Sequence, residues 1–139
     1  MDPRVAKLKT VKECENFAKN ASDRNHPELA TQARERTVQL RAETHDAQTS
    51  VETECLEAIY ALQDVRRRRA NRTWEAIKRH GIIGAVERVV TRPQVSEGFK
   101  MLEDAGLKDY AFENVVLRHP ESFSVEAVEI SRRRLAEAE

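Results

Sequence analysis

The spacing of the apolar residues constrains the fold more than any other feature, because they recur three or four positions apart from residue 10 to residue 135. This spacing places them on one side of an α-helix, whereas a half-buried strand would need strict alternation. Two helix-start signals agree with it, since Thr10 with Glu13 and Thr49 with Glu52 have capping-box spacing. No segment shows a strand pattern. We therefore predict an all-α fold of about eight short-to-medium helices in a single compact bundle.

Proline, glycine and capping residues bound the predicted helices. We expect helices over about residues 10–21, 27–43, 50–65, 71–80, 82–90, 95–105, 109–119 and 124–135. Asn71 is the expected N-cap of the fourth, and Gly81 and Gly106 are expected C-terminal caps. Gly98 is expected to allow a close approach between helices, and Ser124 to start the last helix.

With 139 residues the chain has the length of one domain, so we expect a single α-helical domain over 1–139. Within it, residues 1–69 should form a helical hairpin layer and residues 70–139 a compact bundle of short helices. Each half has few large apolar side chains, so the halves should share a core. Cys14 and Cys55 lie on apolar helix faces without metal-ligand spacing, which predicts buried thiols and fits a reducing cytoplasm. No stretch predicts a signal peptide or a membrane span.

The charge of the chain is unevenly distributed along the sequence. Residues 66–92 hold nine basic and two acidic residues, a net charge of +7. Residues 1–65 hold nine and twelve, a net charge of −3, and residues 93–139 hold six and ten, a net charge of −4. The overall charge of zero is therefore a cancellation between regions. A local excess of cations is typical of surfaces that contact phosphates, because each neutralised phosphate releases counterions.

This excess predicts a non-enzymatic, nucleic-acid-associated helical module that contacts the phosphate backbone of DNA or RNA. The predicted contact residues are Arg66, Arg67, Arg68, Arg69, Arg72, Lys78, Arg79 and Arg88. Two alternatives stay open. The cations form a solvated or internally paired cluster that stabilises a helix C-terminus, or the helices form a protein–protein interaction or assembly module that binds another protein or a second copy of the chain.

Two features near the arginines have a structural and a functional interpretation. The helices on either side of Gly81 have the spacing of a helix-turn-helix, but Glu87 stands where that motif buries an aliphatic residue. A packed helical corner is therefore the better interpretation. Trp74, the only tryptophan, is better interpreted as a core anchor than as a platform for a stacked base.

Motifs that would predict an enzyme are weak, and we predict no catalytic residue, metal site or cofactor. The residues considered are His45 and Asp46, together with Glu54 and Glu57 one turn apart, which a helical metal site could use. We expect Glu54 and Glu57 to lie on a solvated face, and His119, beside Pro120, to cap a helix or be exposed. An enzyme that uses the region of His45 and Glu54 is the third hypothesis.

The segment GFKMLEDAGLKDYAFENVVLRHPESFSVEAVEISRRRL (Gly98–Leu135), preceded by RTWEAIKRHGIIGAVERVV, resembles a small bacterial helical module. That module combines a short helix, a glycine-containing corner, the pattern GF..L...G..D...E..VL, and FS or FT before a terminal R.RL helix. Its members resemble accessory domains of uncharacterised bacterial proteins, some in DNA-restriction or defence settings. The resemblance implies an all-helical, non-catalytic module and supplies no catalytic residues.

Overall fold

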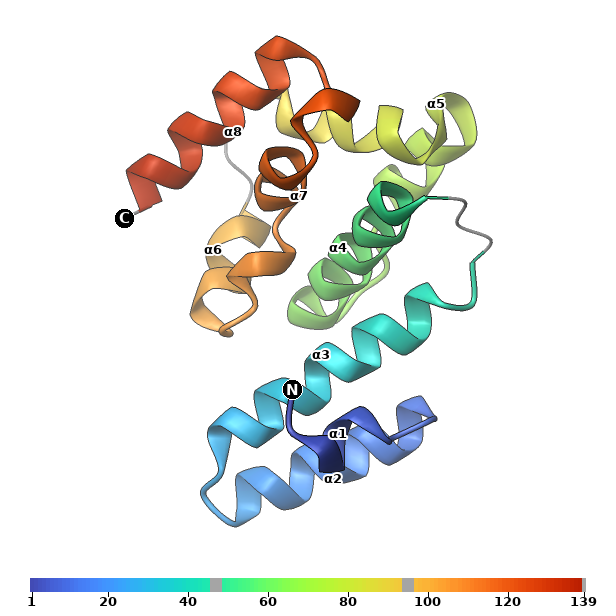
Figure 1. Ribbon diagram of the computed structural model, residues 1–139, viewed down its shortest axis with the longest axis vertical. Helices are drawn as coiled ribbons and strands as arrows, with labels where there is room; N and C mark the ends of the chain where they lie inside the picture. Colours follow the sequence, from blue (N-terminus) through green and yellow to red (C-terminus); the bar gives the residue numbers. More distant parts are fainter. Residues whose placement is uncertain (46–48, 94–96, 139) are drawn as a thin grey trace. The chain divides into compact units, whose positions relative to one another are not determined.

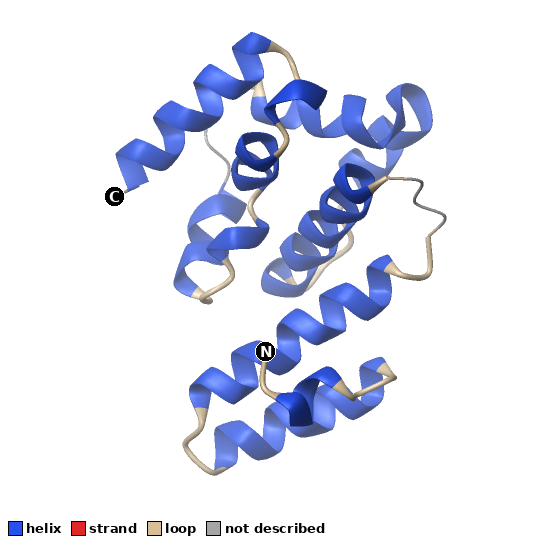
Figure 2. Ribbon diagram, viewed as in Figure 1, coloured by secondary structure: helices blue, strands red, loops and turns tan. Residues whose placement is uncertain are grey.

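The computed structural model describes residues 1–45, 49–93 and 97–138, and every regular element within these ranges is helical (Figure 2). The all-α prediction is therefore confirmed. Asp46 and the first two residues of the helix expected over 95–105 lie outside the described ranges. No helix among the described residues is long and apolar enough to cross a membrane.

The chain divides into two compact units, Met1–Asp46 and Ala47–Glu139. The division follows from the packing of the long helix α4 (Ser50–Arg66), which lies against α5 (Asn71–Val90), α6 (Glu97–Asp104) and α7 (Phe112–Arg118). The structure thus groups α4 with the C-terminal helices, and not with the N-terminal ones as the expected layer over 1–69 required. One domain over 1–139 stays a prediction.

The N-terminal unit consists of a helix hairpin and one added turn. Its elements are α1 (Pro3–Ala6), α2 (Val11–Asp23) and α3 (Pro27–Ala42) (Figure 1). The N-cap half of the predicted capping box is present, since the Glu13 amide donates to Thr10 Oγ1 at 3.1 Å, and Glu13 Oε2 accepts from the Lys9 amide at 2.9 Å. Small side chains such as Cys14 and Ala33, both fully buried, let α2 and α3 pack closely. The sequence did not predict α1, which has four residues and buries Val5.

The C-terminal unit is built around α4, whose fully buried Cys55 and Ile59 belong to its hydrophobic core. Its remaining elements are the short 3₁₀ helices η1 (Lys108–Tyr110) and η2 (Pro120–Ser122) and the last helix α8 (Val125–Ala138). Helices α4 and α6 meet at Gly98, where an added Cβ atom would lie 2.3 Å from Leu62 Cδ1. The close approach expected at Gly98 is therefore confirmed. Gly106, with a φ of 76°, follows α6 in the left-handed conformation of a helix cap.

Helix α5 is broken in its middle, as the two predicted short helices required. Gly81 has a φ of 79° and a ψ of 173°, which an α-helix cannot accommodate. After the break, Glu87 does not stand in a buried aliphatic position but accepts hydrogen bonds from the Ser124 amide at 2.9 Å and from Ser124 Oγ at 2.6 Å. Ser124 Oγ in turn accepts from the Ala127 amide at 3.0 Å and starts α8 as predicted.

Candidate nucleic-acid interface

Five of the predicted contact residues lie at the junction of α4 and α5, which we call the arginine turn and define as Arg66, Arg67, Arg68, Arg69 and Arg72. Arg66 ends α4, and Arg67 follows it in the left-handed conformation, with a φ of 59°. The chain reverses there and α5 begins at Asn71. The side chains of the turn are exposed except that of Arg66, which is half-buried beside Gly98.

Gln63 holds the arginine turn in place, and sequence reasoning missed it. Its backbone carbonyl accepts a hydrogen bond from the Arg67 amide at 2.8 Å. Its side-chain Oε1 accepts from the Ala70 amide at 2.9 Å and from Trp74 Nε1 at 2.7 Å. One glutamine therefore satisfies three donors on both sides of the turn. The only signal in the sequence was a polar residue four positions after Ile59 on the apolar side of α4.

Trp74 closes the turn from the other side. Its half-buried ring packs against the core of the C-terminal unit and lies 5.5 Å from the Tyr60 ring at an interplanar angle of 59°. The Arg69 guanidinium carbon lies 5.8 Å from the centre of the indole, within cation–π range. The interpretation of Trp74 as a core anchor therefore agrees with the structure. Within the arginine turn, the Arg69 guanidinium lies over the Trp74 ring.

The expected N-cap of α5 is wrong. Ala70 occupies the N-cap position and Asn71 is the first helical residue. The Asn71 side chain is used differently, because its Oδ1 accepts a hydrogen bond from Arg69 at 2.9 Å. Because Asn71 is already the first residue of the helix, it does not occupy the position from which an N-cap side chain reaches the first turn.

The arginines from residue 66 to residue 92 differ from those elsewhere in the chain. Six arginines outside this segment form an ion pair with a carboxylate: Arg4, Arg36, Arg41, Arg118, Arg132 and Arg134. In the part of the chain that the structure describes, no arginine between Arg66 and Arg92 does so. The alternative of internal pairing therefore does not hold for these arginines among the described residues.

The other predicted contact residues lie along α5. Lys78 forms an ion pair with Glu75 at 3.5 Å, so one of the eight cations is paired. Arg79 is exposed and follows Arg72 by seven residues, which is two helical turns and places both on the same side of the helix. Arg88 is also exposed, but it follows the break at Gly81, so helical periodicity does not relate it to the others. The structure thus brings together the arginine turn and the first half of α5.

Replacing Gln63 with leucine should reduce the free energy of unfolding of the C-terminal unit by about 1–3 kcal/mol, because the Ala70 and Trp74 donors lose their acceptor. Urea denaturation followed by the fluorescence of Trp74 measures this change. Gln63→Glu, which keeps an acceptor oxygen at the same position, is the control and should stay close to the wild type. Equal stability of Gln63→Leu and the wild type would contradict the role given to Gln63.

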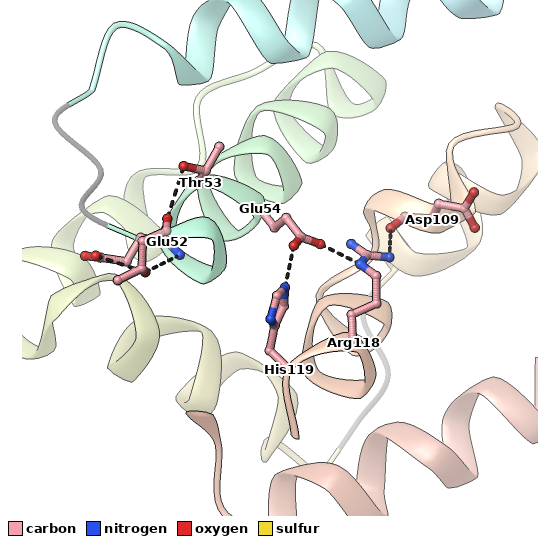
Figure 3. A network of polar contacts seen from close by, with 7 residues as sticks. Glu52, Thr53, Glu54, Asp109, Arg118 and His119 are labelled. Carbon is pink, nitrogen blue, oxygen red and sulfur yellow. Dashed lines mark hydrogen bonds and ion pairs between the residues drawn. The ribbon is translucent and has the colours of Figure 1, made fainter. Parts of the chain in front are cut away.

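A second polar cluster joins α4 to the end of α7 (Figure 3). Glu54 Oε1 accepts from Arg118 Nε at 2.5 Å, and Glu54 Oε2 contacts His119 Nε2. Arg118 also donates to the Asp109 carbonyl at 2.9 Å. The expected solvated position of Glu54 is therefore wrong, since its side chain is only 25% exposed and has two partners. His119 follows α7 as expected, but its side chain is 17% exposed and bonded.

We call Glu54, Arg118 and His119 the clasp, because their contacts hold α4 against the end of α7. Its residues are 64 and 65 positions apart, so no local pattern could have predicted the contact. No group of His, Cys, Asp and Glu among the described residues could hold a metal ion. Cys14 and Cys55 are both buried and form no disulfide. Burial raises the pKa of Cys55 to about 12, which disfavours the thiolate, the reactive form of the side chain.

The Glu54 carboxyl should make stability depend on pH. Burial raises its pKa, but hydrogen bonds from His119 and Arg118 outweigh burial and hold the pKa below the ordinary value of 4.5. A carboxyl whose pKa is lowered by folding stabilises the fold above its unfolded pKa, and this stabilisation is lost as the pH falls through the folded pKa. Below about pH 4.5 the melting temperature of the wild type should therefore fall more steeply than that of Glu54→Gln.

Thermal melts of both proteins between about pH 6 and pH 3 measure the difference in slope. Glu121→Gln, at an exposed carboxylate close in sequence, is the control and should follow the wild type. Parallel curves for Glu54→Gln and the wild type would show that the clasp does not contribute.

Comparison of the chain with protein-family models, curated proteins and solved structures gave no match. The functional argument therefore depends on the residues and contacts described above.

Proposed function

We propose that this chain is a non-enzymatic, nucleic-acid-associated binding module that contacts phosphates through the arginine turn and the first half of α5. The observation that carries the proposal is the contrast in pairing, since most arginines outside residues 66–92 form an ion pair with a carboxylate, and those inside form none with the residues that the structure describes. A guanidinium that has no internal partner keeps its donors and its charge for a ligand. Phosphate oxygens accept from guanidinium in pairs and are its strongest common partners.

The arrangement supports contact with the backbone and not with base edges. Phosphate contacts need charge and donors on an accessible surface, whereas base contacts need an element inserted in a groove. Exposed side chains at a helix junction meet the first requirement. We therefore propose binding to DNA or RNA with little dependence on sequence. A bacterial, cytoplasmic, DNA-related or defence setting is part of this proposal and rests on the resemblance of Gly98–Leu135 and on the unpaired, buried cysteines.

An interaction module for proteins is less well supported. Such a surface normally presents a contiguous apolar patch. Among the described residues only three large apolar side chains are exposed, those of Met1, Met101 and Val125, and they belong to different helices or to the chain start. Binding of the arginines to an acidic protein remains as one outcome of the experiment below.

The test is a fluorescence anisotropy titration of the whole chain with labelled duplex DNA, single-stranded DNA and RNA of equal length. The cations without a described partner at the turn and on the first half of α5 are Arg66, Arg67, Arg68, Arg72 and Arg79. If each neutralises one phosphate, the logarithm of the binding constant for duplex DNA should fall with that of the salt concentration with a slope of about −4.5. Affinity should then decrease about 500-fold between about 50 and 200 mM salt.

Two controls make the result interpretable. A duplex of scrambled sequence should bind with similar affinity, because the backbone carries no sequence information. A polyglutamate peptide of equal charge should bind much more weakly, and stronger binding of that peptide would favour an acidic protein partner. Absence of nucleic-acid binding at low salt, or binding that salt does not weaken, would reject the proposal.

A further inference from the structure

A second basic site lies where α5 ends beside α8 (Figure 1). A pocket of about 230 Å³ opens there, and its lining includes Thr91, Arg92, Ile130, Arg133, Arg134 and Glu137. None of these residues was among the predicted contact residues. The volume is below the roughly 300–1,000 Å³ that surrounds a drug-sized ligand, so a small polar group fits the pocket better.

One of the lining residues, Arg134, is a buried arginine. The Arg134 and Glu113 side chains are each 8% exposed, and Arg134 Nη1 donates to Glu113 Oε2 at 3.3 Å. Arg134 Nη2 also donates to the Arg92 carbonyl. The buried pair therefore fixes the backbone of Arg92 at the pocket wall. Because Glu113 balances the charge of Arg134, the charge available to a ligand comes from the remaining lining residues.

Those residues leave an excess of positive charge. Arg92 and Arg133 are exposed and have no ion pair within the described residues, whereas Arg132 and Arg134, the neighbours of Arg133, are each paired with a glutamate. Among the described residues, Glu137 is the one carboxylate of the lining. Two cations thus face one anion at this pocket.

The end of a helix carries partial negative charge on its carbonyls, which would repel an anion. At the end of α5, hydrogen bonds cover the carbonyl of Glu87 and, just beyond the helix, that of Arg92. Thr91 Oγ1 donates to the Glu87 carbonyl at 2.9 Å, the Thr91 amide donates to the same carbonyl, and Arg134 covers the carbonyl of Arg92. The exposed guanidinium groups of Arg92 and Arg133 are the cations that the pocket offers to an anion.

We propose that this pocket binds a phosphate group between Arg92 and Arg133. Guanidinium groups hold phosphate oxygens with paired, charge-assisted hydrogen bonds, and the pocket offers two such groups on a rigid support. The inference does not depend on the proposed nucleic-acid function. A backbone phosphate of a nucleic acid and the phosphate of a free small molecule would make the same contacts, and the experiment distinguishes these sources.

The primary test is a titration of the ¹⁵N-labelled whole chain with inorganic phosphate, followed by NMR. Saturable shifts are expected at the Thr91 amide and at the side-chain Nε signals of Arg92 and Arg133. Arg133→Ala should bind about tenfold more weakly, since a hydrogen bond to a charged group is lost. Arg132→Ala removes the same charge from the adjacent position, outside the pocket lining, and should bind like the wild type.

A gain of affinity provides an independent check. Glu137→Gln removes the carboxylate of the lining and should bind phosphate about two- to fivefold more tightly. The variant in which Arg67, Arg68, Arg72 and Arg79 are alanine should keep wild-type phosphate binding, which separates this site from the arginine turn. That variant also keeps the two proposals apart, because it should lose nucleic-acid binding and not phosphate binding.

Titration of Arg133→Ala and Arg132→Ala with duplex DNA identifies the source of the phosphate. Lower duplex affinity for Arg133→Ala alone assigns the pocket to the nucleic-acid backbone, and equal affinities assign it to a free phosphate compound. The proposal is overturned if phosphate produces no saturable shifts at the pocket, or if Arg133→Ala and Arg132→Ala bind phosphate equally well.

Discussion

Replacing Arg67, Arg68, Arg72 and Arg79 together with alanine should lower the affinity for duplex DNA by at least about 10²-fold at low salt and reduce the salt slope by about four. These four side chains are exposed and have no described carboxylate partner, so each is available to one phosphate. The substitutions spare Arg66, which lies against Gly98, and Arg69, which lies over Trp74. The turn itself should therefore keep its structure, and anisotropy titrations at several salt concentrations measure the loss.

The matched control removes four cations from the N-terminal unit. Lys7, Lys9, Lys12 and Lys19 are all exposed, and their replacement with alanine changes the net charge by the same amount. That variant should keep most of the affinity and nearly the whole salt slope. An equal loss in both variants would show that net charge, and not the arginine turn, determines binding.

Replacing Glu113 with alanine should have the largest effect on stability. The substitution leaves the Arg134 guanidinium buried without its anion, and breaking a buried pair in this way costs about 3–5 kcal/mol of the free energy of unfolding. The Arg92 carbonyl remains as a partner for Arg134, but a carbonyl does not balance a charge. Urea denaturation followed by Trp74 fluorescence, which reports on the C-terminal unit, measures the change.

Glu129→Ala is the control for this substitution. Glu129 pairs with Arg132 on α8 at 2.6 Å, but both side chains are more than half exposed. Exposed pairs contribute about 0–1 kcal/mol, so this variant should unfold nearly like the wild type. If the two variants lost similar amounts of stability, the Glu113–Arg134 pair would not be an important element of the core.

The sequence predicted most of the helices and several of their ends because these depend on residues close together in the chain. The caps at Thr10, Thr49 and Ser124 use donors three residues away. Gly81 and Gly106 both have the positive φ that ends a helix, which side chains with a Cβ adopt with difficulty. The cap at Asn71 was misassigned because the helix begins one residue earlier than that signal indicates, with Ala70 at the N-cap and Asn71 Oδ1 bound to Arg69.

The candidate site was predicted by composition and not by geometry. The excess of cations in residues 66–92 was visible in the sequence, but pairing depends on carboxylates that folding brings from elsewhere in the chain. Glu54 and Arg118 show this, because they are 64 positions apart and neutralise each other. Grouping α4 with the N-terminal helices had a related cause, since the contacts of α4 with α6 and α7 join residues far apart in the sequence. At the end of α4, Gln63 binds the Ala70 amide and Trp74 Nε1 and so holds α4 and α5 together at the arginine turn.

Arg67 has an exposed guanidinium group but a left-handed backbone conformation that is unfavourable for its side chain. A side chain with a Cβ atom in this region costs about 1 kcal/mol or more relative to glycine, the residue that most often ends a helix in this way. Arg67→Gly would relax the backbone, but it would also remove an exposed guanidinium group from the arginine turn. At residue 67, relief of the backbone strain therefore requires the loss of one positive charge.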